Sequence, residues 1–120
     1  MYAYVNDNKL FYQSNGTGTP VFLVMGFGMS SNAWDPQVRD LKKHHRVLRL
    51  DNRGVARSGS VTTSYQLSDM AQDVIHILDL EGIEKAHIVG VSMGGMISQH
   101  LALTYPDRVR SLTLIATHPG

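Results

Sequence analysis

The sequence predicts an α/β fold: a three-layer sandwich in which an N-terminal hairpin is followed by parallel strands with crossover helices. Short apolar runs recur at 21–25, 46–50 and 112–116, and stretches with helical periodicity separate them. This alternation is typical of parallel sheets, because each crossover returns the chain in the same direction. The run 21–25 is apolar throughout, which indicates a strand that is covered on both faces, and we interpret the other two runs in the same way.

Two short segments at the N-terminus predict the hairpin. Residues 2–5 and 10–13 are rich in aromatic and aliphatic side chains. Between them, residues 6–9 read Asn-Asp-Asn-Lys, and Asn and Asp tolerate the backbone angles of tight turns. We therefore expect an antiparallel pair of strands that opens the sheet.

Two segments predict helices. The segment 34–43 is expected to form a short helix, and Pro36 is tolerated in its first turn because no N–H donor is needed there. The segment 67–81 is expected to form a longer helix that ends before Gly82, a residue suited to a left-handed cap. Apolar side chains at helical spacing predict the buried face of this helix: Leu67, Met70, Ala71, Val74, Ile75 and Leu78.

The composition fits one domain and disfavours several classes of partner. The chain has 120 residues, 42% of them hydrophobic, and a formal net charge of +1. Its 11 basic residues form no block, so we expect neither nucleic acid nor a membrane surface as a partner. The absence of cysteine excludes disulfides and thiolate ligands, and we expect no cofactor and no metal. Without a leader or a membrane-length apolar run, the expected location is the cytoplasm.

The most informative motif is the Gly-Val-Ser-Met-Gly sequence at 90–94. It continues the apolar run 86–91 and precedes a helix-forming stretch. A serine on a sharp strand-to-helix turn projects its hydroxyl out of the backbone, which makes Ser92 the candidate catalytic nucleophile. Gly90 and Gly94 flank this serine because the strand and helix backbones approach too closely for a Cβ atom.

The helix expected after the motif supplies a candidate oxyanion donor. This helix, at 93–104, points its free N–H groups and the positive end of its dipole at the space beside Ser92. Negative charge develops there on the carbonyl oxygen of a substrate during acyl transfer. The backbone N–H of Met93 is therefore the first candidate donor to that oxygen.

Three further segments lie next to expected strands, two of them before the serine motif in the sequence and one after it. They are Met-Gly-Phe-Gly at 25–28 with Trp34 downstream, the segment 51–58 and Tyr-Pro-Asp-Arg-Val at 105–109. Together with the serine motif, they resemble the α/β-hydrolase superfamily, closest to its small esterase, lactonase and haloperoxidase-like members. The resemblance covers essentially the whole chain.

The resemblance implies a cofactor-free serine hydrolase that acts on a carboxylic ester, lactone or related small acyl substrate through an acyl-enzyme. It also implies that the N–H of Phe27 is the second oxyanion donor and that Trp34 packs against the loop carrying it. Arg53 is interpreted as a structural donor to neighbouring loops.

Two residues depart from the family pattern. Met25 stands where a histidine is common, so the hydrogen bond of that histidine must be replaced or lost. Ala56 stands where a glycine is common, and we expect the alanine to be tolerated because its φ is negative.

By the same resemblance, residues 1–120 form the N-terminal part of a single hydrolase domain, with about six of the usual eight strands. The cap and the C-terminal strands lie beyond it, together with the loops that carry the family's acid and histidine. His118 follows the strand expected at 112–116 but precedes the family's position for the base. The other histidines are interpreted as surface or packing residues. We expect a second chain or a C-terminal segment to complete the sheet.

Other functions compete with ester hydrolysis. The alternatives are a non-catalytic or regulatory hydrolase-like protein that binds a ligand or partner, and a haloperoxidase-like or C–C hydrolase. A dinucleotide site is disfavoured, because no third glycine follows 26–28 at the required spacing. Asp69 and Asp73 lie one helical turn apart, and a solvated helix face explains them better than paired catalytic carboxylates.

Overall fold

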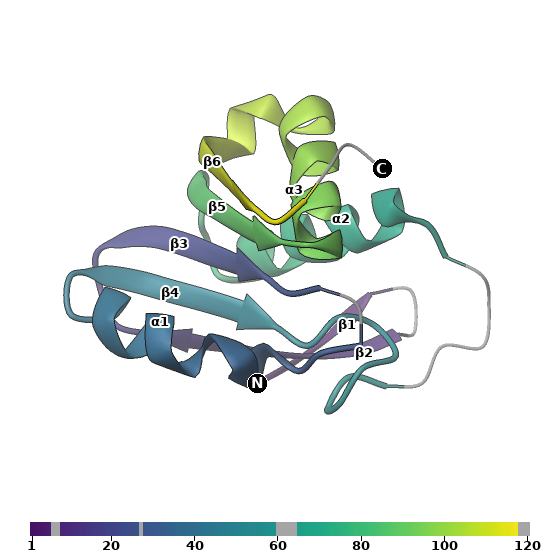
Figure 1. Cartoon of the computed structure of the whole chain (residues 1–120), viewed down its shortest axis with the longest axis horizontal. Coiled ribbons are helices and arrows are strands. Elements are labelled where there is room, and N and C mark those ends of the chain that lie inside the picture. The colour runs from purple at the N-terminus through teal and green to yellow at the C-terminus, as the bar shows by residue number, and fades with distance from the viewer. Residues whose placement is uncertain (6–7, 27, 60–64, 118–120) are drawn as a thin grey trace.

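A six-stranded sheet forms the central layer of the structure (Figure 1). The computed structural model describes residues 1–5, 8–26, 28–59 and 65–117. Each strand overlaps one of the apolar segments expected to form a strand. The strands are β1 Tyr2–Val5, β2 Asn8–Asn15, β3 Thr19–Val24, β4 His45–Leu50, β5 Ala86–Val91 and β6 Val109–Ile115.

The strands lie in the order β1-β2-β4-β3-β5-β6 across the sheet. β1 pairs antiparallel with β2, which confirms the predicted hairpin, and β2 pairs antiparallel with β4. From β4 onward the neighbouring strands β4, β3, β5 and β6 are parallel. The carboxyl ends of these four strands therefore meet at one edge of the sheet, where open α/β folds bind their ligands.

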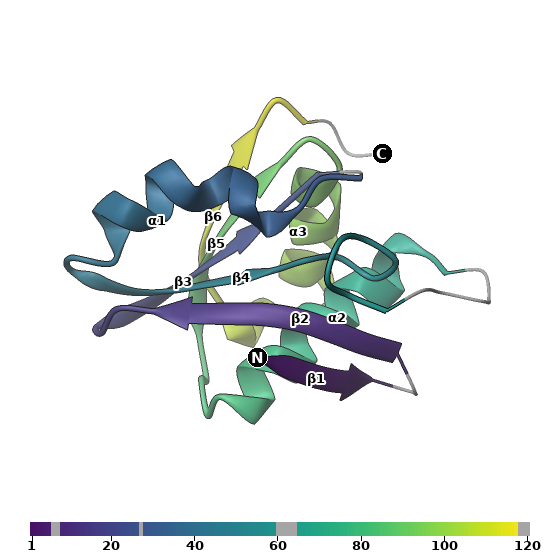
Figure 2. The ribbon, with the colours of Figure 1, turned by 90° about the horizontal axis from the view of Figure 1, so that it is seen from below.

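Helices cover both faces of the sheet, which confirms the predicted three-layer sandwich (Figure 2). On one face, α1 (Asp35–Leu41) packs over an apolar cluster that includes Leu23 and Val47. On the other face lie α2 (Leu67–Leu80) and α3 (Met93–Thr104). A larger core fills the space beneath these two helices, and its fully buried members include Phe22, Leu48, Val74, Ile88 and Leu101.

The helix expected at 34–43 is shorter than predicted, and a 3₁₀ turn precedes it. A 3₁₀ turn, η1, covers Ser31–Trp34, and α1 follows it with Pro36 in its first turn. The Ser30 hydroxyl accepts a hydrogen bond of 3.2 Å from the Asn32 N–H. This serine cap starts the turn earlier than the apolar pattern predicted.

α2 ends as predicted. Gly82 follows it with a φ of +68°, and its N–H donates to the carbonyl of Asp79 at 3.2 Å. The Ile83 N–H then reaches back to the Leu78 carbonyl at 2.8 Å, which completes a left-handed helix cap. No helix within the described ranges is long and apolar enough to cross a membrane.

One interpretation of α2 is wrong, because Asp69 and Asp73 do not form a solvated helix face. Asp73 is only 1% exposed and accepts hydrogen bonds of 2.8 and 2.6 Å from Arg53. Asp69 accepts the N–H of Gln66 at 2.8 Å and so closes a capping box at the start of the helix. Arg53 is a structural donor, as predicted, but its main partner is a buried carboxylate on α2.

β6 lies at the free edge of the sheet and is exposed along its length. Residues 110–116 are all exposed, among them the large apolar side chains of Leu112, Leu114 and Ile115. Within the described part of the chain, β6 pairs only with β5. An apolar edge strand of this kind offers unpaired backbone groups and apolar surface to a further segment.

Candidate active site

Ser92 occupies the turn between β5 and α3, at the carboxyl edge of the parallel strands. Its φ of +55° and ψ of −123° lie in a region that non-glycine residues rarely adopt. The residue is exposed. The sharp, strained strand-to-helix turn that the motif predicted is therefore present.

Hydrogen bonds on both sides hold the backbone of Ser92. Its N–H donates to the Ile115 carbonyl of β6 at 2.9 Å. Its carbonyl accepts the N–H of Gly95 at 2.9 Å and the hydroxyl of Thr117 at 2.7 Å. These contacts offset the cost of the strained conformation and fix the direction in which the side chain leaves the chain.

The flanking glycines are required by close backbone contacts. A Cβ on Gly90 would lie 2.3 Å from the carbonyl oxygen of Gly94 and 2.4 Å from Ser98 Oγ, so strand and helix do approach as predicted. A Cβ on Gly94 would instead lie 2.2 Å from the carbonyl oxygen of Val24. The second glycine therefore allows α3 to approach the neighbouring strand β3, a contact between segments that the motif did not reveal.

The loop after β3 begins against the side chain of Ser92. A Cβ added to Gly26 would lie 3.3 Å from Ser92 Cβ and 3.8 Å from its Oγ. The Asn52 side-chain amide donates to the carbonyl of Met25 at 3.0 Å and anchors the start of this loop. Asn52 therefore provides a hydrogen bond at the place where Met25 departs from the family pattern. Phe27, the expected second oxyanion donor, lies outside the described residues.

Met93 is the first residue of α3. The first N–H groups of a helix have no partner within the helix, so the Met93 N–H is available beside Ser92. The positive end of the helix dipole adds to the potential at this point. An arrangement of this kind suits a developing negative charge, and the role of Met93 as an oxyanion donor stays a prediction.

A buried carboxylate supports the same edge of the sheet. Asp51 follows β4 and is fully buried. It accepts hydrogen bonds from the Ser31 N–H at 2.8 Å, the Ser31 hydroxyl at 2.7 Å and Arg57 Nε at 2.9 Å. Burial by itself raises the pKa of Asp51, but the hydrogen bonds from Arg57 and Ser31 outweigh it and lower the pKa to about 2. Asp51 therefore stays ionised and ties η1 to the loop after β4.

Two further expectations about this region have different outcomes. Trp34 is 5% exposed and packs in the α1-side core with Met25 and Val38, so it belongs to the scaffold, as expected. Ala56 has a φ of +47°, and the negative φ expected for it is wrong. The glycine that is common at this position would adopt this conformation without strain.

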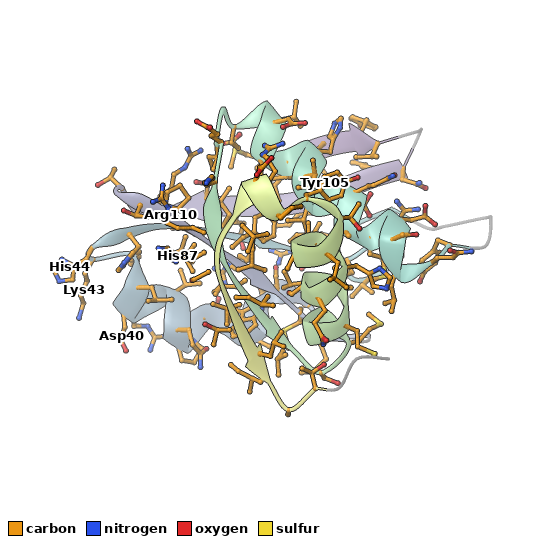
Figure 3. The ribbon with its side chains drawn as sticks, turned by 90° about the horizontal axis from the view of Figure 1, so that it is seen from above. Asp40, Lys43, His44, His87, Tyr105 and Arg110 are labelled. Atoms are coloured by element: carbon orange, nitrogen blue, oxygen red, sulfur yellow. The ribbon has the colours of Figure 1, made fainter. Side chains whose placement is uncertain are left out.

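The described histidines make no hydrogen bond to the serine. His87 lies on β5, and its Nδ1 is 2.6 Å from the hydroxyl of Ser111 on β6 (Figure 3). His44 is exposed at the far end of α1 (Figure 3). His118, the one histidine expected near the site, lies outside the described residues. Among the residues that the structure describes, no histidine or carboxylate is hydrogen-bonded to Ser92 Oγ.

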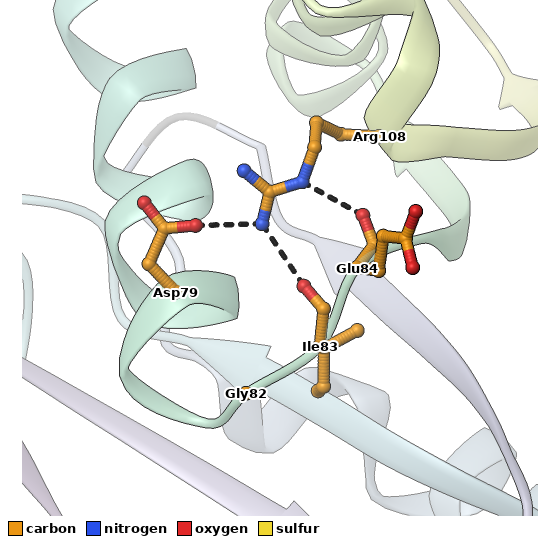
Figure 4. A pocket seen from close by; sticks show the side chains of 5 residues that line it. All are labelled: Asp79, Gly82, Ile83, Glu84 and Arg108. Atoms are coloured by element: carbon orange, nitrogen blue, oxygen red, sulfur yellow. Dashed lines mark hydrogen bonds and ion pairs between the residues drawn. The ribbon is translucent and has the colours of Figure 1, made fainter.

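A pocket of about 420 Å³ opens elsewhere on the surface, lined by Asp79, Gly82, Ile83, Glu84 and Arg108 (Figure 4). Arg108 donates to Asp79 at 2.7 Å and to the carbonyls of Ile83 at 2.9 Å and Glu84 at 2.7 Å. These residues precede β5 and β6, whereas Ser92 follows β5. The pocket therefore lies at the opposite edge of the sheet, and its arginine ties the 3₁₀ turn Pro106–Arg108 to the end of α2 and to the segment that follows it.

Comparison with known families and proteins agrees with this arrangement. The family model described as alpha/beta hydrolase fold matches residues 19–120. A relative from Azorhizobium caulinodans, provisionally named carbamate hydrolase RutD, is 40% identical over 114 residues, which cover 95% of this chain and 43% of that protein.

Two solved structures extend the comparison. An enol-lactonase from Burkholderia xenovorans LB400 is 34% identical with a TM-score of 0.93, and the match covers 98% of this chain and 46% of that one. A meta-cleavage product hydrolase from Pseudomonas fluorescens IP01 is 30% identical with a TM-score of 0.91, over 98% and 44% of the two chains. The chain spans less than half the length of these relatives. Since the family model matches most of its residues, the chain belongs to the α/β-hydrolase family.

Proposed function

We propose that the chain forms the nucleophile-bearing part of a cofactor-free serine hydrolase that cleaves a carboxylic ester, lactone or related acyl substrate. The observation that carries this proposal is the backbone of Ser92, which has a φ of +55° and is hydrogen-bonded on both sides at the carboxyl edge of the sheet. Such a conformation costs about 1–3 kcal/mol and persists mainly where geometry serves function. A turn that exposes a serine hydroxyl at this edge suits nucleophilic attack.

The proposed reaction has two steps. Ser92 Oγ forms a bond to the acyl carbon while its proton passes to a base, and the N–H of Met93 donates to the resulting oxyanion. The resemblance to the family assigns the second donor to the N–H of Phe27. The C–O bond to the leaving alcohol then breaks, the alcohol takes the proton from the base, and an acyl-enzyme remains. Water attacks this ester in the same way, releases the acid and returns the proton to Ser92.

The base and the acid that orients it come from outside residues 1–120 in this proposal. A C-terminal segment or a second chain supplies both and pairs with the exposed edge of β6. The incomplete hydrogen bonding and apolar surface of β6 support this arrangement. Residues 1–120 alone are therefore expected to show little or no turnover.

The relatives support the substrate class. The names of the Azorhizobium and Burkholderia relatives refer to a carbamate and an enol-lactone, and both groups have an acyl carbon bonded to a heteroatom. The similarity to the meta-cleavage product hydrolase favours a second candidate, hydrolysis of a carbon–carbon bond at the same serine. A non-catalytic, ligand-binding protein is the remaining alternative, and it requires no reactive serine.

Hydrolysis of p-nitrophenyl acetate tests the proposal. The assay compares the 120-residue chain with the full product of its coding sequence, each as wild type, Ser92→Ala and Ser68→Ala. Ser68 is an exposed serine on α2 and serves as the matched control. In the full product, we expect Ser92→Ala to lose at least about a thousandfold in kcat and Ser68→Ala to lose nothing.

Two results would contradict the proposal. Equal turnover by the wild type and Ser92→Ala forms of the full product would exclude Ser92 as the nucleophile. Robust, Ser92-dependent turnover by the monomeric 120-residue chain would show that the acid and base are not missing from it. Weak turnover by that chain decides nothing, because an oxyanion hole alone leaves residual catalysis.

A further inference from the structure

A pocket of about 180 Å³ lies between α1 and the strands β2 and β4, on the face of the sheet that α1 covers. Asn15 ends β2, and Arg49 lies on β4 in the strand pair that β2 forms with it. The other lining residues come from α1 and from the residue just after it. The complete lining is Asn15, Asp35, Val38, Arg39, Lys42 and Arg49.

Arg49 is buried in this pocket but is only partly satisfied. It is 7% exposed, and its Nη1 donates to the Asp35 carboxylate and, at 3.2 Å, to the Ser31 carbonyl. Its Nε is buried and has no hydrogen-bond partner among the described residues. A buried donor without a partner is costly, so an acceptor that fits beside Nε would bind favourably.

The charges around the pocket favour an anion. Arg39, Lys42 and Arg49 carry three positive charges, against one negative charge on Asp35. That carboxylate already pairs with Arg49. Arg39 and Lys42 are exposed and lie one helical turn apart, so both can turn toward a bound ion.

Two amides beside Arg49 add polar groups without partners. Asn15 Oδ1 and Gln13 Oε1 are both buried and have no hydrogen-bond partner in the described part of the chain. Gln13 lies directly opposite Arg49 in the β2–β4 pair. A rotation of either amide group by 180° exchanges the positions of its oxygen and its NH₂ group, so each side chain can present donors instead of the acceptor. An oxyanion in the pocket could then receive hydrogen bonds from Asn15 as well as from Arg49.

We propose that this pocket binds a small oxyanion, a phosphate or carboxylate group, through Arg49 Nε and the charges of Arg39 and Lys42. A volume of about 180 Å³ is several times the roughly 30 Å³ that one water occupies and is below the roughly 300–1,000 Å³ of pockets for larger organic ligands. The site therefore suits one anionic group with accompanying water. It is independent of the proposed catalysis, because it lies under α1 and not at the turn after β5.

Nuclear magnetic resonance of the ¹⁵N-labelled full product of the coding sequence tests the proposal, with inorganic phosphate as the probe at constant ionic strength. The readout is the Nε–H resonance of Arg49, assigned by its loss in Arg49→Lys. Arg39→Gln and Lys42→Gln each remove one charge from the pocket. Lys43→Gln is the matched control, because Lys43 is adjacent in sequence but pairs with Asp40 outside the pocket (Figure 3).

We expect a saturable shift of the Arg49 Nε–H signal. Lys42→Gln and Arg39→Gln should weaken binding by about three- to fivefold each, as loss of an exposed ion pair does, and Lys43→Gln should leave it unchanged. An acetate titration separates the two ligand classes: tighter binding of phosphate assigns the site to phosphate groups, and tighter binding of acetate assigns it to carboxylates.

The proposal would be overturned if neither anion gave a saturable shift of this signal, since water alone would then satisfy Arg49. It would also be overturned if Lys43→Gln weakened binding as much as Lys42→Gln, since the effect would then be one of general charge. If Arg49→Lys fails to fold, through-bond correlation of the Nε–H with the other atoms of Arg49 assigns the signal in the wild type, and both outcomes remain measurable.

Discussion

Arg53 and Asp73 join the loop after β4 to α2 through two hydrogen bonds of 2.8 and 2.6 Å, with both side chains buried. Burial raises the pKa of the Asp73 carboxyl, and the hydrogen bonds from Arg53 oppose that shift. The same hydrogen bonds raise the pKa of Arg53 above its usual value. The bidentate geometry is that of an ionised pair, in which each charge depends on the other.

Replacing Arg53 by methionine should therefore destabilise the fold strongly. The variant leaves the Asp73 carboxylate buried without its counterion, and such a loss lowers the free energy of unfolding by about 3–5 kcal/mol. Urea denaturation measures this change. Arg110→Met, at an exposed position on β6, is the control and should change it by less than about 0.5 kcal/mol. A loss of less than about 1 kcal/mol for Arg53→Met would contradict the role given to the pair.

Asp51 makes the fold sensitive to acid. Its pKa is about 2 in the folded chain, against the usual 3.8, so protonation favours the unfolded state. The stabilisation from Asp51 is fully present above about pH 4 and is lost as the pH falls through about 2. A shift of this size corresponds to about 2 kcal/mol.

The corresponding measurement is the free energy of unfolding of wild type and Asp51→Asn as a function of pH. The difference between them should be largest near neutral pH and should shrink as the pH approaches 2. Asp107→Asn removes an exposed carboxylate and should show no comparable difference. A gap between wild type and Asp51→Asn that stays constant down to about pH 2 would rule out the proposed linkage.

Ala56→Gly should stabilise the chain. Ala56 has a φ of +47°, where a Cβ atom costs about 1–2 kcal/mol, and glycine removes that strain but adds about 0.5–1 kcal/mol of chain entropy. The expected net gain is up to about 1 kcal/mol, seen as a higher Tm. Ala102→Gly, inside α3, should instead lower the Tm. If both substitutions destabilise alike, the strain assigned to Ala56 is absent.

Gly90→Ala should disrupt the turn that carries Ser92, because the new Cβ would lie 2.3 Å from a backbone oxygen that cannot move freely. We expect a loss above about 3 kcal/mol in the free energy of unfolding. Gly82→Ala is the comparison, since its Cβ would meet nothing within 4 Å and only its φ of +68° is unfavourable. That variant should lose about 1–2 kcal/mol. Equal losses would show that the close contact at Gly90 does not govern the turn.

Elements with a local cause could be predicted from the sequence. The run 86–91 forms β5, residues 93–104 form α3, and Gly82 caps α2, because apolar periodicity and glycine act over a few residues. The conformation of Ser92 could be predicted for the same reason, since the flanking glycines and the abrupt change from strand to helix are adjacent in the chain.

Contacts between distant segments could not be predicted in this way. Asp73 has the helical spacing of a solvated carboxylate, and its partner Arg53 is 20 residues away. The contact of Gly94 with Val24 depends on the neighbouring strand, which the motif does not specify. The pocket around Arg49 combines residues from β2, α1 and β4, so only the assembled sheet brings them together.

The measurement that tests the central claim most directly is covalent labelling with a fluorophosphonate probe, followed by peptide mass spectrometry. The probe reacts with a serine that a neighbouring base activates. In the full product of the coding sequence we expect a single adduct, on Ser92, that is absent from Ser92→Ala and retained in Ser68→Ala. The isolated 120-residue chain should remain unlabelled. An adduct on another residue, or a folded full product that stays unlabelled, would contradict the assignment of Ser92 as the nucleophile.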